Sequence, residues 1–192
     1  MSTTDTQPIG DTPALLAAIA RGWQPKYVLF WGHTPKAAGV GRHVLSQWWP
    51  ARFKIDGDSY ISAEHCMMAE KARLFGDEET RRSILATSKP GAAKALGRTV
   101  RGFSEQLWER HRFDVVVKAS AAKFAQNADL RAYLIETGDK VLVEASPVDR
   151  VWGIGLAADD ARAEQPAAWQ GLNLLGFALM RARAELVTAG PR

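Results

Sequence analysis

The sequence predicts one mainly α-helical α+β domain with a small antiparallel sheet. Apolar residues recur with helical spacing in several segments, whereas the runs typical of strands are few and short. The chain has 192 residues, of which 46% are hydrophobic, so it can bury a sizeable core. Because the strands are scattered among several helices, a doubly wound sheet is not expected.

The first half of the chain is expected to alternate short strands with helices. Thr12 can act as an N-cap before Pro13, which predicts a short helix that ends near Gly22. Residues 27–31 are β-branched and aromatic and predict a strand, and residues 52–60 alternate in polarity around a turn and predict a hairpin. Capping residues then open three successive helices, over residues 62–75, 77–87 and 88–97.

The second half continues this helical pattern. A long helix is expected over residues 105–126, and a break near His111 is one alternative. A short helix follows over residues 127–136, and residues 141–145 predict a strand. The last helix is expected over residues 167–186, where leucine and alanine recur at helical intervals.

Glycine interrupts the last helix twice, at Gly171 and Gly176. Each glycine inside a helix costs about 1 kcal/mol relative to alanine. We therefore expect another backbone or a ligand to approach closely at these two positions. A second pair, Gly153 and Gly155, marks a tight irregular segment before the helix.

The composition limits the class of protein. Twenty-five Lys and Arg residues against 21 Asp and Glu give a formal net charge of +4, which suits a phosphate-bearing ligand or weak attraction to nucleic acid without requiring either. The single cysteine, Cys66, excludes an intrachain disulfide and fits a reducing cytoplasm. No run approaches the roughly 20 apolar residues that span a bilayer, so a soluble cytoplasmic protein is expected.

Several common site motifs are missing from the sequence. There is no glycine-rich nucleotide-binding loop and no G-x-S-x-G motif. The four histidines form no H-x-x-x-H pair, and a single cysteine does not support a structural zinc site. We therefore expect no metal and no organic cofactor. No oligomeric state follows from the sequence.

The first group of candidate site residues lies in the helix expected over residues 62–75. Glu64, Met68 and Lys71 share one face of that helix, because they stand at positions i, i+4 and i+7. A carboxylate and an ammonium group on such a face could line a cleft. The alternative is a solvated charged stripe. The apolar residues on the other sides of the helix favour a position near a pocket.

Two further groups follow along the chain. Asp149 and Trp152 stand in a loop after a strand, where a tryptophan could stack on a base and an aspartate could bond a sugar hydroxyl or a water. The alternative is a turn around a core tryptophan. Lys94 and Arg98 are one helical turn apart and could clamp a phosphate, unless they are solvated surface residues. The third, cationic group also includes Lys118 and Lys123.

Several segments together resemble the NADAR (YbiA-like) family, in the family's order and from about Phe30 to Leu186. No one segment is specific, but all of them in order are difficult to obtain by chance. They are Tyr60-x-Ser-x-Glu64-His65-x-Met-x-x-x-Lys71, Pro90-x-x-Ala-Lys94-x-x-Gly97-Arg98, Lys123-Phe124-x-Gln126-Asn127, Leu134-x-x-Thr137-Gly138, Leu142-Val143-Glu144-Ala145, Asp149-x-x-Trp152-Gly153-x-Gly155 and Trp169-x-Gly171-x-Asn173-x-Leu175-Gly176.

The resemblance implies a largely helical domain with a small sheet over residues 26–188, after an N-terminal extension over residues 1–25. It also implies an N-glycosidase. Members of the family cleave ribosylamino-pyrimidine 5′-phosphates, which are early intermediates of riboflavin biosynthesis, and other members remove ADP-ribose from guanine in nucleic acid. The expected partner is therefore a small ribosyl phosphate, with ADP-ribosylated nucleic acid as the alternative.

The resemblance also implies site residues. Glu64, Lys71, Asp149 and Trp152 match residues of the family's motifs. Where the family usually has Leu-Ser-Asn-Phe, this chain has Leu45-Ser46-Gln47-Trp48, and the larger amide and indole groups are expected to alter the base pocket. Besides Trp152, the expected substrate-binding residues are Ser46, His65, Lys94, Arg98, Gly153 and Asn173.

Two mechanisms are compatible with these residues. In the first, Glu64 stabilises an oxocarbenium-like ribose or activates water, and Asp149 orients the ribose or the water. In the second, Lys71 attacks the opened ribose aldehyde and forms a Schiff base, while Glu64 moves protons. A non-catalytic nucleotide-binding module is the alternative to an enzyme. Glu64 and Asp149 argue against it, because a phosphate binder gains little from carboxylates near an anion.

Overall fold

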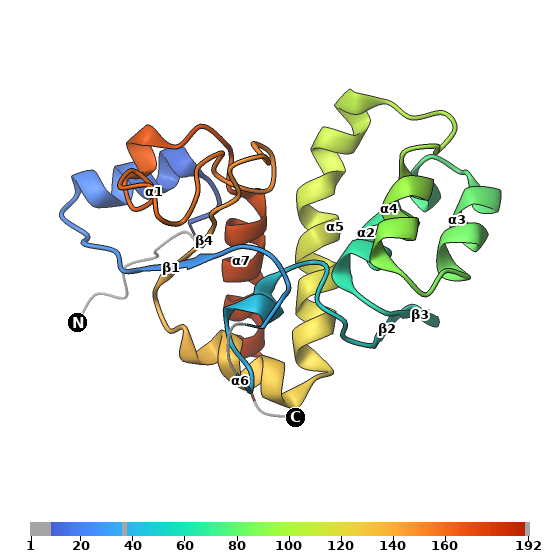
Figure 1. Cartoon of the computed structure of the whole chain (residues 1–192), viewed down its shortest axis with the longest axis horizontal. Helices are drawn as coiled ribbons and strands as arrows, with labels where there is room; N and C mark the ends of the chain where they lie inside the picture. Colours follow the sequence, from blue (N-terminus) through green and yellow to red (C-terminus); the bar gives the residue numbers. More distant parts are fainter. Residues whose placement is uncertain (1–8, 36–37, 191–192) are drawn as a thin grey trace.

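The computed structural model describes residues 9–35 and 38–190, and it confirms a mainly helical fold with a few short strands (Figure 1). In chain order the elements within these residues are α1 (Thr12–Ala20), β1 (Tyr27–Phe30), the 3-10 helix η1 (Arg42–Leu45), β2 (Phe53–Ile55), β3 (Asp58–Tyr60), α2 (Ala63–Leu74), α3 (Glu78–Leu85), α4 (Pro90–Gly97), α5 (Glu105–Ala125), α6 (Ala128–Glu136), β4 (Val141–Glu144), the 3-10 helix η2 (Pro166–Ala168) and α7 (Leu174–Thr188).

The strands form two separate pairs. β2 and β3 make the expected antiparallel hairpin, with a turn in which Asp56 and Gly57 both have positive φ. β1 and β4 pair in parallel, with Phe30 opposite Glu144. The sequence did not indicate this second pair, because its strands lie far apart in the chain. Its register places Glu144 at the last paired position of β4.

Helices α5 and α7 lie side by side in the middle of the molecule (Figure 1). On one side of them lie α1, β1 and β4, and on the other side lie α2, α3, α4 and the β2–β3 hairpin. The core has two parts, and β4 contributes to both because successive strand residues point to opposite faces. Leu142 packs in the larger part, whereas Val141 and Val143 pack in the smaller part with Leu15 of α1.

The ends of several helices follow the expected capping chemistry. The Ser62 hydroxyl accepts a hydrogen bond from the N–H of His65 at 3.2 Å, and this fixes the start of α2. Asp77 caps α3 in the same way. At α1 the expected cap is wrong by one residue, because Asp11 accepts the N–H of Ala14 at 2.7 Å. The alternative break near His111 is also wrong, since α5 is continuous from Glu105 to Ala125.

Helix α7 begins later than its apolar spacing indicated. Asn173 has a left-handed backbone with φ of 53°, so the regular helix starts at Leu174. The expected close approach at both glycines is confirmed: a Cβ atom at Gly171 would lie 2.3 Å from the carbonyl oxygen of Gly153, and one at Gly176 would lie 2.0 Å from that of Leu142. The glycines therefore let α7 and the preceding loop pack directly on β4 and on the segment after it.

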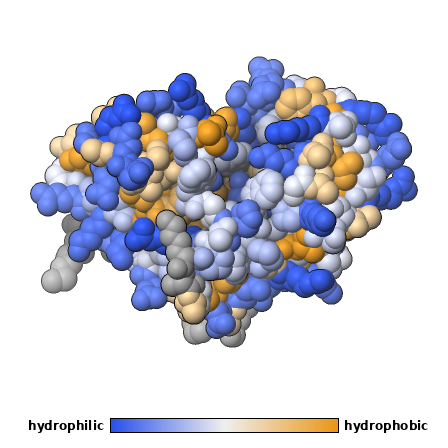
Figure 2. Space-filling model, in the orientation of Figure 1, coloured by the Kyte–Doolittle hydropathy of each residue, from blue (hydrophilic) through white to orange (hydrophobic). Residues whose placement is uncertain are grey.

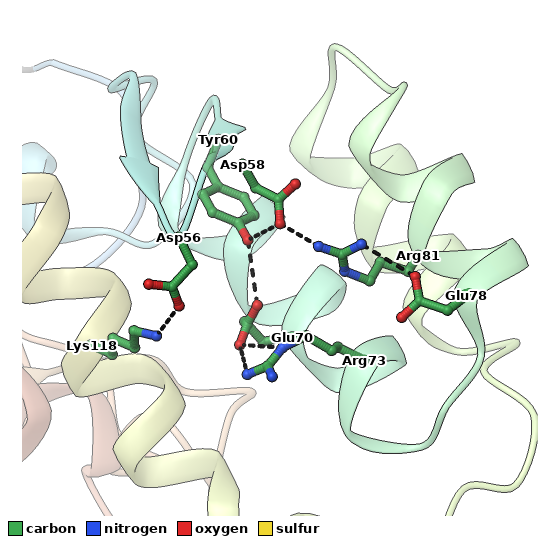
Figure 3. A network of polar contacts seen from close by, with 8 residues as sticks. All are labelled: Asp56, Asp58, Tyr60, Glu70, Arg73, Glu78, Arg81 and Lys118. Carbon is green, nitrogen blue, oxygen red and sulfur yellow. Dashed lines mark hydrogen bonds and ion pairs between the residues drawn. The ribbon is translucent and has the colours of Figure 1, made fainter.

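The β2–β3 hairpin is attached to the helices by a network of polar contacts (Figure 3). The hydroxyl of Tyr60 donates to Glu70 on α2 at 3.4 Å, and the guanidinium of Arg73 donates to the other oxygen of Glu70. Arg81 on α3 pairs with Asp58. These contacts keep the hairpin against the second half of α2 and against α3. No helix in the described parts of the chain has the length and apolar character needed to cross a bilayer.

Candidate active site

A pocket of about 170 Å³ lies where α2, α4 and α5 meet the loop that follows β4. Figure 2 shows the surface hollowed at its upper edge, between that loop and the start of α5. The lining residues are Ser46, Gln47, Trp48, Glu64, Met67, Met68, Lys71, Lys94, Gly97, Arg98, Trp108, Glu144, Asp149 and Trp152. Glu64, Met68 and Lys71 thus lie on one helix face, as their spacing predicted, and that face lines the pocket instead of forming the solvated stripe that was the alternative.

Glu64 lies in the first turn of α2 and is only 2% exposed. Its N–H donates to the carbonyl of Gln47 at 3.0 Å, which ties the helix start to the segment after η1. Its Oε1 atom has no hydrogen-bond partner among the described residues. Burial raises the pKa of its carboxyl group to about 7; the nearby charge of Asp149 acts in the same direction, and Lys94 and Arg98 oppose it. Near neutral pH the group can therefore both accept and donate a proton.

Glu144 lines the pocket but was not assigned to the site from the sequence, and the same holds for Met67 and Trp108. It ends β4, where its N–H donates to Oδ1 of Asn173 at 3.0 Å and its carbonyl accepts the N–H of Ile154 at 2.9 Å. Burial raises the pKa of its carboxyl group to about 8, and the charges of Asp149 and Glu64 add to this effect. The sequence feature that could have identified Glu144 as a site residue is its position directly after three apolar strand residues.

Unpaired buried oxygens are concentrated in this pocket. Within residues 9–35 and 38–190, the buried side-chain oxygens that lack a partner are Oε1 of Gln47, Oε1 of Glu64 and Oε2 of Glu144. All three residues line the pocket. A buried polar atom without a hydrogen bond costs about 1–3 kcal/mol, so such atoms are uncommon in native proteins without a reason. A polar ligand in the pocket would supply the missing partners.

Asp149 lines the pocket and also makes hydrogen bonds that stabilise its own loop. Its Oδ1 atom accepts the N–H groups of Val151 and Trp152, both at 2.8 Å. Its own N–H donates to the hydroxyl of Ser146 at 3.2 Å. The aspartate therefore shapes the turn that presents the half-buried Trp152 to the pocket.

Three cations line the pocket. Nζ of Lys71 donates to the carbonyl of Gly97 at 2.8 Å and lies 4.1 Å from the centroid of the Phe103 ring. Burial lowers the pKa of this lysine, and Glu105 opposes the effect. Lys94 and Arg98 lie near the end of α4, with Nζ of Lys94 5.5 Å from the ring of Trp48. These cations can attract a phosphate into the pocket.

Glycine brings α4 close enough to contribute these cations. A Cβ atom at Gly97 would lie 2.1 Å from the sulfur of Met68. The missing side chain lets the end of α4 pack directly on α2, beside Lys71 and Glu64. Ser46 also lines the pocket, and its hydroxyl accepts the N–H of Trp48 at 3.2 Å.

Three residues expected to bind substrate lie outside the pocket lining. Nδ1 of His65 accepts the N–H of Ile61 at 3.3 Å, so Nε2 carries the proton and donates to the carbonyl of Ile84 at 2.7 Å. Asn173 is fully buried and bonds β4 at two points, Glu144 and Leu142. Gly153 packs against the carbonyl of Glu144. All three make backbone contacts that hold the site's scaffold.

Lys118 and Lys123 are also absent from the pocket wall. Lys118 pairs with Asp56 at 2.7 Å on the hairpin side of the molecule. Lys123 is buried, and its Nζ donates to the carbonyls of Val44 at 2.6 Å and Ser46 at 2.9 Å. Burial lowers its pKa to about 7. This lysine anchors the segment that carries Ser46 and Gln47 to α5.

The pocket acids do not form a metal site. Among the residues that the structure describes, no cluster of three or more His, Cys, Asp or Glu side chains is arranged to hold a metal ion. The chemistry available from the chain itself is that of two buried carboxyl groups, a third carboxylate, three cations and tryptophan side chains. Paired carboxyl groups in a pocket are the usual equipment for hydrolysing a glycosidic bond.

The fold and this acid-lined pocket define a glycosidase-like hydrolase. The NADAR domain family model matches residues 29–187, and the chain belongs to that family. It is 47% identical to N-glycosidase R617 of Acanthamoeba polyphaga mimivirus over 165 residues, which cover 83% of this chain and 96% of the relative. It is 36% identical to N-glycosidase YbiA of Escherichia coli (strain K12) over 138 residues, or 72% of this chain and 76% of that protein.

A solved structure agrees with the family assignment. The NMR structure of the E. coli protein YbiA superposes with a TM-score of 0.69 at 29% identity and covers 87% of this chain and 88% of that one. The resemblance inferred from the sequence motifs is therefore confirmed. The chain is an enzyme, a hydrolase that acts on N-glycosyl compounds.

Proposed function

We propose that the enzyme hydrolyses the N-glycosidic bond of a ribosyl compound with a 5′-phosphate, and that ribosylamino-pyrimidine 5′-phosphates are its substrate class. The observation that supports this most directly is the pocket itself, where buried unpaired oxygens of Glu64 and Glu144 occur with the cations Lys94 and Arg98. The oxygens suit a ribose that gains positive charge, and the cations suit a phosphate.

Glu64 is the residue to which we assign the central role. Breaking the bond between C1′ of the ribose and the base nitrogen builds positive charge on the sugar ring. A carboxylate beside C1′ stabilises that charge or removes a proton from the attacking water. Glu64 is buried, has no partner at Oε1 among the residues that the structure describes, and is able to change protonation near pH 7. Asp149 would orient the ribose or the water, and Trp152 would stack on the base or the sugar.

The size of the pocket favours a small substrate. Its volume of about 170 Å³ is below the roughly 300–1,000 Å³ of pockets that enclose a drug-sized ligand. A ribosyl group with part of its base can be enclosed there, whereas most of an ADP-ribosylated nucleic acid would have to lie outside. Removal of ADP-ribose from guanine is therefore the second substrate class to test.

The mechanism through Lys71 differs from the mechanism through Glu64 because it forms a covalent intermediate, which can be trapped. Lys71 lines the pocket, and its lowered pKa increases the neutral fraction that could attack an opened ribose aldehyde. Its bond to the carbonyl of Gly97 and its position over Phe103 hold the amine in place. Borohydride would reduce a Schiff base to a stable adduct, which should disappear in Lys71→Ala. We expect no adduct during turnover if the Glu64 route operates.

The first experiment uses the purified protein and Glu64→Gln with a ribosylamino-pyrimidine 5′-phosphate and, separately, with ADP-ribosylated guanine DNA. Chromatography follows the free base and the released sugar phosphate. We expect release from the small substrate and a loss of at least about 100-fold in Glu64→Gln. Release that survives the substitution would overturn the role of Glu64. No release from either substrate by the folded protein would favour a non-catalytic binding module.

A further inference from the structure

Glu144 is partly buried, and the environment of its carboxyl group is not explained by a purely structural role. Its backbone is held on both sides, by Asn173 at the N–H and by Ile154 at the carbonyl. The side chain that this clamp presents to the pocket has a buried Oε2 atom without a partner in the described part of the chain. A rigid backbone with an unpaired buried carboxyl oxygen is suited to contact a ligand at a defined position.

The surroundings of Glu144 keep a proton in the pocket at neutral pH. Three carboxyl groups line it, and they cannot all ionise without strong mutual repulsion. Burial and the charges of Asp149 and Glu64 raise the pKa of Glu144, and Lys94 is the cation that opposes them. The charged and titratable groups that share the pocket with Glu144 are Glu64 and Lys71 from α2, Lys94 and Arg98 from α4 and its C-cap, and Asp149 from the loop after β4.

The reaction needs such a proton. When the bond from C1′ to nitrogen breaks, the electron pair of the bond stays on nitrogen. An amine is a poor leaving group unless that nitrogen gains a proton as the bond breaks. Water then adds its oxygen to C1′ and gives up one proton. A complete cycle therefore needs one group that donates a proton and one that accepts a proton.

We propose that Glu144 is the general acid that protonates the departing base nitrogen, while Glu64 accepts the proton of the attacking water. This assignment rests on the proposed N-glycosidase function and adds a second catalytic residue to it. One proton leaves Glu144 for the nitrogen, and one proton arrives on Glu64 from water. Transfer of that proton back to Glu144, directly or through solvent, restores the starting state with one water consumed.

The pH profile distinguishes this role from one in substrate binding. The acid must be protonated and the base ionised, so kcat/KM, which reports the free enzyme, should fall below about pH 7 with Glu64 and above about pH 8 with Glu144. In Glu144→Gln we expect kcat to fall by about 10²–10⁴-fold, with KM little changed and the alkaline fall of the profile gone. Glu164→Gln, at an exposed position outside the pocket lining, is the matched control.

A change of leaving group sharpens the test. In a ribosyl 5′-phosphate whose C1′ is bonded to a pyridinium nitrogen, the base leaves as neutral pyridine and needs no proton. We expect Glu144→Gln to lose less than about 10-fold on that substrate, while Glu64→Gln still loses the activity. An equal loss of kcat on both substrates, or an unchanged alkaline limb in Glu144→Gln, would overturn the acid role while leaving the proposed function intact.

A measurement without turnover keeps the two proposals separable. The wild-type protein should show a carboxyl ¹³C resonance that is absent in Glu144→Gln and titrates near pH 8. A resonance for Glu144 that titrates at pH 4–5 would contradict the assignment even if the enzyme is active. If the wild type cleaves neither ribosyl phosphate, the N-glycosidase proposal and the acid role that rests on it both fail. The titration then reports only where Glu144 holds its proton.

Discussion

Helix α2 carries two buried glutamates whose surroundings differ. Glu70 lies against the hairpin, where Tyr60 and Arg73 donate to its two carboxylate oxygens (Figure 3). Glu64, two turns earlier, faces the pocket and leaves Oε1 without a partner in the described chain. The two side chains are 7% and 2% exposed, so burial alone does not separate them. The difference lies in their partners: one acid is satisfied by the fold, and the other is available to a ligand.

The same contrast distinguishes the β2–β3 hairpin and its neighbours from the pocket. On the hairpin side, Asp58 pairs with Arg81 and Asp56 with Lys118, so acids and bases are matched within the chain. In the pocket, Glu64 and Glu144 each have an oxygen that is unpaired within the described parts of the chain. Leaving those groups unpaired is unfavourable for folding. We infer that the cost is retained because the pocket groups act on a substrate.

The largest expected effect compares the two glutamates directly. Glu64→Gln should reduce kcat by about 10²–10⁴-fold, because it removes the carboxylate that stabilises the ribose cation or activates water. Glu70→Gln keeps an acceptor for Tyr60 and should retain activity within about 2-fold. Steady-state release of free base measures both. Equal losses in the two variants would show that the comparison reflects stability and not chemistry.

The second effect is on stability as a function of pH. Both Glu64 and Glu144 have folded-state pKa values raised above the ordinary 4.5, to about 7 and about 8. The folded state therefore binds more protons than the unfolded state between about pH 4.5 and pH 8, and stability falls as pH rises through that range. Glu64→Gln/Glu144→Gln removes the ionisation and should be more stable than the wild type by about 2–4 kcal/mol at pH 8.5.

Urea unfolding at several pH values measures this difference. The advantage of the double variant should shrink as pH falls and approach zero only below about pH 4, where the wild-type acids are protonated in both states. Glu70→Gln is the control: because its acid is already paired in the fold, we expect a loss of stability at pH 8.5 and not a gain. A pH-independent difference would mean that the pocket acids are not protonated by burial.

How far the sequence predicted this site depends on whether the decisive interactions are local. Helical spacing placed Glu64 and Lys71 on one face of α2, and both line the pocket. The parallel pairing of β1 with β4, which positions Glu144, joins strands far apart in the chain and left no local signal. Glu144 stands in one of the family motifs, but the sequence alone therefore gave it no role in the site.

Residue type alone also does not separate site residues from their supports. His65 and Asn173 belong to the family motifs, and their side chains bond to backbone groups and not to the pocket. A histidine or asparagine that binds backbone has the same sequence signature as one that binds a ligand. Likewise, Lys123 was grouped with phosphate-binding cations but holds the carbonyls of Val44 and Ser46.

The third prediction concerns the packing that supports the pocket. Gly176→Ala would place a Cβ atom 2.0 Å from the backbone carbonyl of Leu142, and a backbone atom cannot rotate away. We expect the free energy of unfolding to fall by about 1–3 kcal/mol, because α7 must move away from β4. We also expect a lower kcat, because this movement shifts Asn173 and Glu144. Thermal unfolding and the release assay test this. Ala178→Gly is the control: it removes a buried methyl group from the same helix and itself costs about 1 kcal/mol or somewhat more, but it introduces no clash with β4 and should leave kcat unchanged.

The smallest expected effect concerns Glu70, the buried glutamate whose carboxylate oxygens both have partners in the fold. Glu70→Ala removes the partner of the Tyr60 hydroxyl and the ion pair with Arg73, whose side chain is 56% exposed. An exposed ion pair contributes little, so the expected loss is about 1 kcal/mol in urea unfolding, and the kcat and pH profile of the enzyme should be unchanged. A change in the pH profile would show that the network of Figure 3 reaches the pocket through α2. The protonation of Glu64 would then depend on Glu70, and the two glutamates of α2 could not be divided into one with a structural role and one with a chemical role.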